Sequence, residues 1–133
     1  MSMDYYAVYS PCALVINDEL AKLMLEKKGI TFDPEDDPKT KLYDEFLLND
    51  VSGFYYISDF TGEVTPLFES ADWETIEDSV FYVECNHDPS LFRAVYSSEE
   101  ELIKEFERNL KDFLPDGFDI KGHLHVIIGT TFG

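Results

Sequence analysis

The sequence has no lysine or arginine between Leu42 and Phe92, a stretch of 51 residues that contains twelve acids. The whole chain of 133 residues has 28 acids and ten basic residues, which gives a formal net charge of -18. The residues outside that stretch hold sixteen acids and all ten bases, a net of -6, so the middle segment contributes -12. Direct binding of nucleic acid is not expected, because a phosphate backbone would meet a strongly negative protein.

Cysteine is also scarce, since Cys12 and Cys85 are the two that the sequence contains. Small secreted scaffolds usually carry more cysteines, so we expect reduced thiols and a cytoplasmic protein. No apolar run approaches the roughly 18 residues that a membrane span needs. The N-terminus has no basic region followed by an apolar stretch, so we expect no secretory signal and no membrane partner.

Several catalytic signatures are missing from the sequence. It contains no G-x-S-x-G, no G-x-x-x-x-G-K and no G-x-G-x-x-G pattern. The carboxylates between Asp33 and Asp44 are spaced partly like a calcium loop, but Pro38 stands where such a loop needs glycine. We therefore identify no catalytic residues and no calcium site.

The composition nevertheless predicts a folded protein. Hydrophobic residues make up 44% of the chain and aromatic residues 15%, whereas disordered chains of similar charge lack such residues. The length suits one domain that spans residues 1–133. Because a one-signed charge of this size destabilises a compact state by self-repulsion, a basic partner is worth considering.

The first third of the chain has clear local signals. Aromatic and β-branched residues predict a strand over residues 4–10. Ser10-Pro11 fits the cap and first position of a helix. Helical spacing is established by Asp18, and Gly29 is a suitable C-terminal stop. Residues 12–16 can be read either as the start of this helix or as extended chain.

The central segment predicts β-hairpins. Residues 54–60 and 63–68 flank Thr61-Gly62, which is typical of a hairpin turn. Pro66 cannot donate a ladder hydrogen bond, so we expect its strand to lie at an edge of the sheet. The other predicted elements are a short helix at 41–48, a loop or helical turn at 70–78, a hairpin of 80–86 with 91–96, a capped helix at 98–114 and a strand at 121–131.

The element order β-α-α-ββ-ββ-α-β predicts an α+β fold. We expect a single-layer, mostly antiparallel sheet of about five or six strands, with two main helices packed on one face. Such a sheet leaves its other face partly open, and we expect binding at that open face.

Two short patterns suggest a metal site. Cys85-x-His87 and His123-x-His125 each place two donor atoms on one side of a strand. If the two strands were neighbours, the four side chains could bind zinc or a related metal. A small metal-binding protein or metal-dependent enzyme is therefore one alternative function. The simpler interpretation is that these residues lie at a turn and on a sheet surface.

The leading hypothesis is a non-catalytic interaction protein that binds a basic surface through its acidic, aromatic middle segment. Inhibitors and immunity-type proteins that occupy a nucleic-acid-binding surface place carboxylates where phosphates would lie. The residues that we expect to contact the partner are Asp59, Glu63, Glu69, Asp72, Trp73, Glu74, Glu77 and Asp78. Another alternative is a subunit of a larger assembly whose acids only provide solubility, and adaptation to high salt would produce the same charge.

Overall fold

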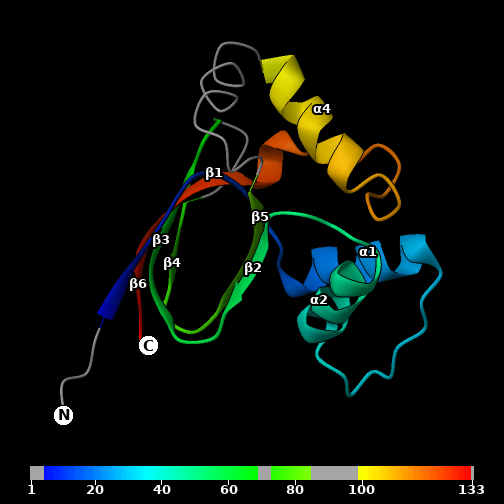
Figure 1. The fold of residues 1–133 in the computed structure, drawn as a ribbon, viewed down its shortest axis with the longest axis horizontal. Helices are drawn as coiled ribbons and strands as arrows, with labels where there is room; N and C mark the ends of the chain where they lie inside the picture. The colour runs from blue at the N-terminus through cyan, green and yellow to red at the C-terminus, as the bar shows by residue number, and fades with distance from the viewer. Residues whose placement is uncertain (1–4, 69–72, 85–98, 133) are drawn as a thin grey trace.

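The computed structural model describes residues 5–68, 73–84 and 99–132 (Figure 1). Six strands form one antiparallel sheet in the order β2-β5-β1-β6-β3-β4, with the helices beside it. The predicted α+β class and element order are confirmed. The elements are β1 (Tyr5–Val15), α1 (Asp18–Lys28), α2 (Pro38–Leu48), β2 (Phe54–Ile57), β3 (Phe60–Pro66), β4 (Glu74–Ile76), β5 (Val80–Glu84), α4 (Glu99–Asn109), the short 3-10 helix η1 (Lys121–His123) and β6 (Leu124–Phe132).

Strand β1 is longer than the sequence predicts, because it continues through Pro11 to Val15. The prediction that Ser10-Pro11 begins a helix is wrong. Two residues of β1, Pro11 and Cys12, lie opposite one residue of β6, because Ser10 pairs with Ile127 and Ala13 with His125. This irregularity is a β-bulge, a place where a proline without an N–H is tolerated inside a sheet.

The bulge changes which side chains of β1 lie on each face of the sheet. Val8 before it and Ala13 after it belong to one buried cluster, whereas Cys12 and Leu14 belong to another. All four side chains are buried. Other elements of the fold must therefore pack against both faces of β1.

The helices cover one face. Helix α1 begins where the Asn17 side chain accepts a hydrogen bond from the Leu20 N–H at 2.8 Å, and it ends at Gly29, whose φ is 78°. Helix α2 begins at Pro38 after the cap Asp37, three residues earlier than predicted. The helical residues buried against this face are Leu20, Ala21, Met24, Leu25, Leu42, Phe46, Leu102 and Phe106.

Phe46 of α2 connects these layers. Its ring centroid lies 5.4 Å from that of Phe54 in β2, 5.6 Å from that of Phe81 in β5 and 5.0 Å from that of Phe113 after α4. Aromatic contacts of this kind add about 0.5–1.5 kcal/mol each to the burial of the rings. One side chain thus holds α2, two strands and the segment after α4 together.

A long bent hairpin covers the other face. Strands β2 and β3 follow one another along one arm, and β4 and β5 along the other, because Ile57 pairs with Val80 and Gly62 with Ile76. At the bend the Phe60 N–H donates to the Asp78 carbonyl at 2.8 Å. One half of the hairpin joins β1 and the other half joins β6, so the sheet curls over itself (Figure 1).

The predicted hairpin turn at Thr61-Gly62 is therefore wrong. Gly62 lies within β3 and pairs directly with Gly129 of β6. A Cβ atom on Gly129 would lie 2.4 Å from the Phe60 ring, and one on Gly62 would lie 2.7 Å from it. The two glycines leave space for the buried Phe60 ring, which packs in the second core. The members of that core are Val8, Ala13, Phe60, Val64, Val80, Tyr82 and Ile127.

Other predictions need smaller corrections. Strand β3 is not an edge strand, since it pairs with both β6 and β4, but Pro66 lies beyond the last pair with β4 and so interrupts no bond there. The segment predicted as a loop or helical turn contains β4. Helix α4 ends at Asn109 rather than residue 114, and turns after it still bury Leu110 and Phe113. Residues 91–96 and the predicted cap Ser98 lie outside the described residues.

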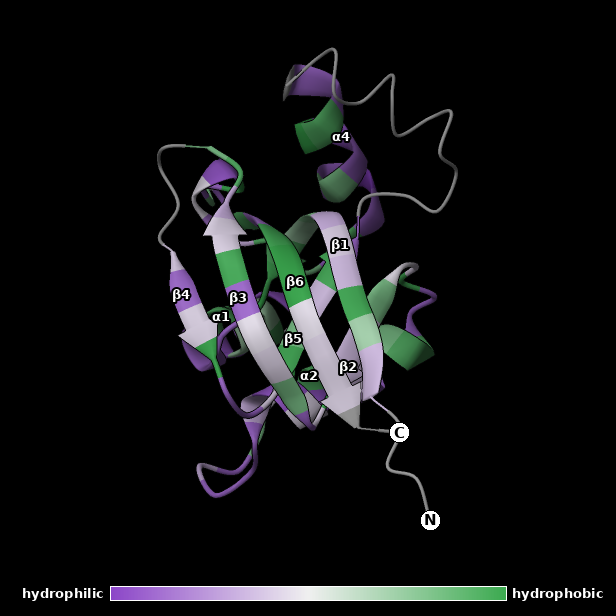
Figure 2. Cartoon of the chain, turned by 90° about the vertical axis from the view of Figure 1, so that its left-hand side faces the viewer, coloured by the Kyte–Doolittle hydropathy of each residue, from purple (hydrophilic) through white to green (hydrophobic). Residues whose placement is uncertain are grey.

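The expectation about the open face also needs correction. The face opposite the helices is filled by the curl of the sheet itself. The bare surface is the outer side of β1, β6, β3 and β4, which continues the helix-covered face beyond the helices (Figure 2). In the described ranges, no helix is long and apolar enough to cross a membrane.

Replacing Gly129 with alanine is expected to destabilise the protein by about 2 kcal/mol, because the new methyl group would overlap the Phe60 ring and the Thr61 carbonyl. Urea denaturation measures the loss. Thr130→Ala, at the exposed next residue, is the control and is expected to change stability by less than about 0.5 kcal/mol. Equal losses in both variants would show that the ring does not occupy the space above the glycine pair.

Candidate functional site

Six of the eight residues predicted to bind a partner lie in the described part of the chain, and all six are exposed. Three of them, Asp59, Glu77 and Asp78, lie at the bend of the long hairpin. Glu63 and Glu74 lie on β3 and β4, and Trp73 directly precedes β4 with 55% of its surface exposed. Glu69 and Asp72 lie outside the described residues. We call the six described residues the acidic surface.

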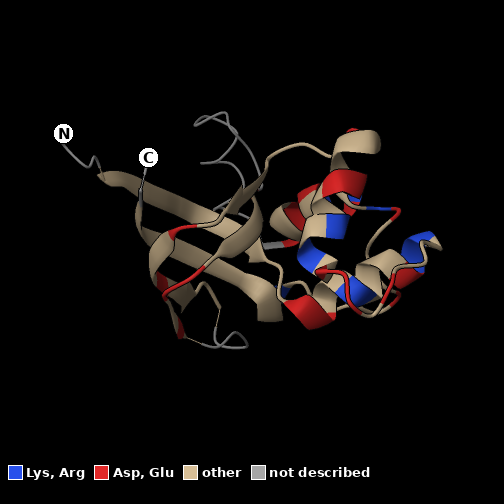
Figure 3. Cartoon of the chain, turned by 90° about the horizontal axis from the view of Figure 1, so that it is seen from below, with Lys and Arg blue, Asp and Glu red and all other residues tan. Residues whose placement is uncertain are grey.

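Among the described residues, lysines and arginines lie outside the strands and the hairpin bend, whereas acids lie in both parts of the molecule (Figure 3). The six strands contain Glu63, Glu74 and Glu84 and no lysine or arginine. Helix α1 carries three acids and three lysines and α2 carries two of each, so these two helices are balanced, whereas α4 carries five acids and two basic residues, Lys104 and Arg108. Within the described ranges the ion pairs are Lys27–Asp116 and Arg108–Glu105, both on the helical side.

The central acids do not all share one face. Asp44 and Glu45 lie on α2, and Asp50 follows it, so these three lie apart from the acidic surface. Within the acidic surface, Glu63 faces outward opposite Ile128, whereas Glu74 pairs with Val64 on the inner face. The acids of the acidic surface therefore lie along the border of the curled sheet, at the bend and at the β3–β4 edge, and we call this border the rim.

Exposed aromatic side chains beside this rim were not identified from the sequence. Tyr5 and Tyr9 of β1 are 62% and 63% exposed, and Ile128 of β6 is 56% exposed. Tyr9 pairs with Ile128, which in turn pairs with Glu63. The alternation of tyrosines in residues 5–9 was a usable signal, but strand partners are needed to show that they gather beside an acid.

Of the four predicted metal donors, His123 and His125 lie in the described part of the chain, which contains no group of three or more His, Cys, Asp or Glu side chains that could hold a metal. His123 lies on η1 rather than on a strand, so it does not project on the same side of one strand as His125. The buried His125 donates from Nδ1 to the His123 carbonyl at 3.0 Å. Cys85 and His87 lie outside the described residues.

Both histidines line a small pocket of about 110 Å³. The ring of His123 lies 4.7 Å from that of Phe118, and its Nδ1 lies 3.2 Å from the Asp119 carbonyl oxygen. Glu74 of the acidic surface reaches the same pocket from β4. These contacts give the two rings structural roles in joining η1 to β6.

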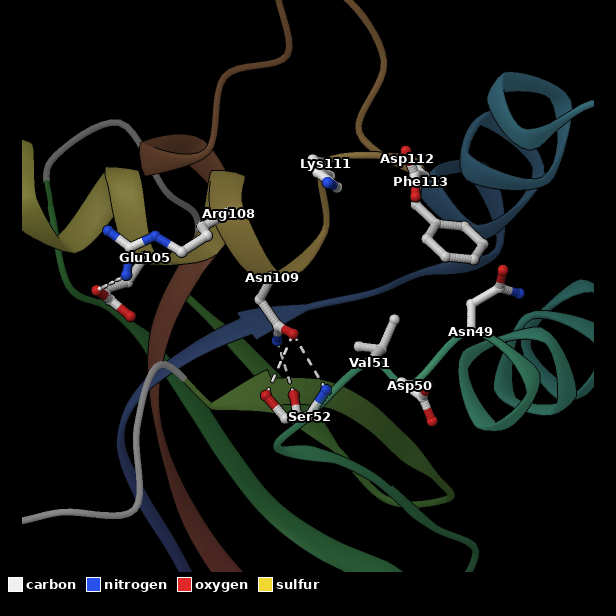
Figure 4. A pocket seen from close by; sticks show the side chains of 10 residues that line it. All are labelled: Asn49, Asp50, Val51, Ser52, Glu105, Arg108, Asn109, Lys111, Asp112 and Phe113. Carbon is white, nitrogen blue, oxygen red and sulfur yellow. Dashed lines mark hydrogen bonds and ion pairs between the residues drawn. The ribbon is translucent and has the colours of Figure 1, made fainter.

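A larger pocket of about 380 Å³ lies between α4 and the segment that follows α2 (Figure 4). Asn109 closes its base, since its Oδ1 accepts hydrogen bonds from the Ser52 N–H at 3.1 Å and hydroxyl at 3.2 Å, and its Nδ2 donates to the Ser52 carbonyl at 2.7 Å. Arg108 in its wall pairs with Glu105 at 2.7 Å. Three acids and two basic residues line the pocket, so it has no strong preference for either sign of charge.

Two tyrosines lie at the end of the inner face. The rings of Tyr55 and the buried Tyr82 have centroids 5.4 Å apart. Burial raises the pKa of Tyr82, and the nearby Glu84 carboxylate raises it further. Burial and Glu84 raise the pKa of Tyr55 in the same direction. Both hydroxyls are therefore held in the neutral form, which suits packing.

Asn109→Ala is expected to destabilise the protein by about 1–2 kcal/mol, because it removes three hydrogen bonds that fix Ser52 to α4. Urea denaturation gives the magnitude. Asn49→Ala, in the wall of the same pocket, is the matched control and retains these three bonds. A loss below about 0.5 kcal/mol for Asn109→Ala would show that the bonds do not secure the pocket.

Alkaline pH is expected to destabilise the protein through Tyr82. The unfolded chain releases the tyrosine proton near pH 10, whereas the fold holds it to higher pH, so the stabilisation is complete below pH 10 and falls as pH rises further. The limiting slope for one such group is about 1.4 kcal/mol per pH unit. Urea denaturation at several alkaline pH values should therefore show a steeper loss for the wild type than for Tyr82→Phe, and parallel losses would contradict this assignment.

Comparison with protein-family models, curated proteins and solved structures found no match to this chain. Inference about its function therefore depends on the side chains themselves. The described features that a partner could recognise include the acidic surface and the exposed aromatic side chains beside it.

Proposed function

We propose that this protein is a non-catalytic interaction protein that binds a basic partner through the acidic surface. The observation that carries the proposal is that the described strands and the bend of the hairpin carry acids but no lysine or arginine. The five exposed carboxylates of the acidic surface have no lysine or arginine on the described strands or the bend to balance them, whereas the helices carry basic residues beside their acids. Acids that served solubility alone would have no need of this separation.

The acidic surface would act mainly on the rate and specificity of association. Fields from clustered charges extend over about 8 Å at physiological ionic strength and about 30 Å at low ionic strength. They accelerate encounters with a surface of opposite sign and reject partners of the same sign. Trp73, half exposed at the start of the edge strand β4, would supply an aromatic anchor within the charged rim.

The class of partner follows from the same chemistry. A protein surface that binds nucleic acid presents lysines and arginines spaced to meet phosphates. Carboxylates of an inhibitor or immunity-type protein can take the places of those phosphates, so we propose such a surface as the partner. A cytoplasmic location belongs to this proposal, and the buried Cys12 thiol, which forms no disulfide among the described residues, is compatible with it.

The test compares two variants of equal net charge. The first neutralises the acidic surface with the substitutions Asp59→Asn, Glu63→Gln, Glu74→Gln, Glu77→Gln and Asp78→Asn. The control neutralises five exposed acids on the helices and their connections, with the substitutions Glu19→Gln, Glu26→Gln, Glu35→Gln, Asp44→Asn and Glu107→Gln. Binding of an oligolysine peptide is measured by calorimetry at low and physiological ionic strength.

The surface variant is expected to bind the peptide about tenfold more weakly or worse, since five exposed charge contacts of a few tenths of a kcal/mol each amount to that factor. The control is expected to lose less than about threefold, and wild-type binding should weaken as salt rises. Equal losses in the two variants would mean that only net charge matters, which would favour a solubilising role. Binding insensitive to salt would also contradict the proposal.

A further inference from the structure

The outer side of β1, β6, β3 and β4 is a sheet face that no described helix covers (Figure 2). Where this face meets the helices, Leu14 and Leu124 pair with each other and are fully buried. Further along the same strands the paired side chains become exposed. The helical layer therefore covers only part of one continuous face.

A row of side chains crosses the bare part of this face at right angles to the strands. Tyr9 of β1 pairs with Ile128 of β6, and Ile128 pairs with Glu63 of β3. All three side chains are exposed. Since neighbouring strands lie about 4.8 Å apart, the backbone positions of Tyr9 and Glu63 lie about 10 Å apart, with the Ile128 side chain between their two long side chains.

The next row along the strands consists of small side chains, which form a flat surface. Ala7 of β1 pairs with Thr130 of β6, and Thr130 pairs with Thr61 of β3. These three residues are also exposed. Tyr5 lies beyond them on the same side of β1. The two tyrosines therefore stand above a low surface that an extended side chain from a partner could cross.

An arginine side chain fits this arrangement. The face of its guanidinium group stacks on an aromatic ring while the N–H edge of the same group pairs with a carboxylate, and its aliphatic stem packs on apolar side chains. A lysine ammonium can make the ion pair but stacks less well. Within the described ranges, Glu63 has no ion pair with a lysine or arginine of this chain.

We propose that the row Tyr9–Ile128–Glu63 is the anchor of the partner interface and receives an arginine of the basic partner. The inference rests on the proposed function, which it deepens by naming the side chain that is recognised. A second copy of this chain is a poorer occupant, because it would bring Glu63 and a further charge of -18 against the same acidic rim.

The test uses oligoarginine and oligolysine peptides of equal length, with binding measured by calorimetry at physiological ionic strength. The wild type is expected to bind oligoarginine about three- to fivefold more tightly than oligolysine, which is the factor expected for a stacking contact at an exposed site. Tyr9→Ser and Ile128→Thr are each expected to reduce this preference by half or more while leaving oligolysine binding within twofold. Tyr9→Phe is expected to retain it.

Leu48→Ser is the matched control, because Leu48 is 76% exposed but lies on α2. It should leave the preference for arginine unchanged, and circular dichroism of every variant checks that the sheet is intact. Equal binding of both peptides by the wild type would overturn this inference without touching the proposed function, whereas failure of both peptides to bind would overturn the two together. A wild-type dimer that Tyr9→Ser dissociates in light scattering would assign the row to self-association and overturn the inference.

Discussion

Strand β1 has apolar side chains on both faces between Cys12 and Val15, and the rest of the structure follows from the need to cover both. A half-exposed antiparallel strand shows a simple alternation of apolar and polar residues, but a strand buried on two sides does not. Here the helices cover one face and the curled hairpin covers the other. The bulge at Pro11 lets a single strand serve both cores, because it changes the side on which successive residues lie.

The second core depends on an uncommon piece of close packing. The ring of Phe60 occupies the space that side chains at Gly62 and Gly129 would fill, and these two glycines face each other on neighbouring strands. Glycine within a strand usually weakens it, since it has no side chain to pack. In this protein the Phe60 ring packs over both glycines and fills the core inside the curled sheet, which offsets this loss of side-chain packing.

The curl also determines where charge and exposed aromatics lie. The bend of the hairpin brings Asp59 together with Glu77 and Asp78, although β3 and β4 lie between these residues in the sequence. The same curl turns β6 and the first half of β1 away from the helices, which leaves Tyr9 and Ile128 exposed. A surface with acids at its rim and aromatic side chains in its middle is therefore a product of topology.

Local signals in the sequence were sufficient for the helices and for the class of fold. Asn17 and Gly29 bound α1 as expected, because a cap and a left-handed glycine act on residues within one turn of them. The stretch without lysine or arginine between Leu42 and Phe92 could likewise be read from the order of residues, as could the element order. Gly62 led to the wrong prediction of a turn. A glycine is needed there because a side chain would overlap the Phe60 ring and the backbone of Gly129. Strand partners, the bulge and the exposed row beside Glu63 were decided only by tertiary structure, because pairing between distant strands depends on which faces must be buried and not on the residues nearby in the chain.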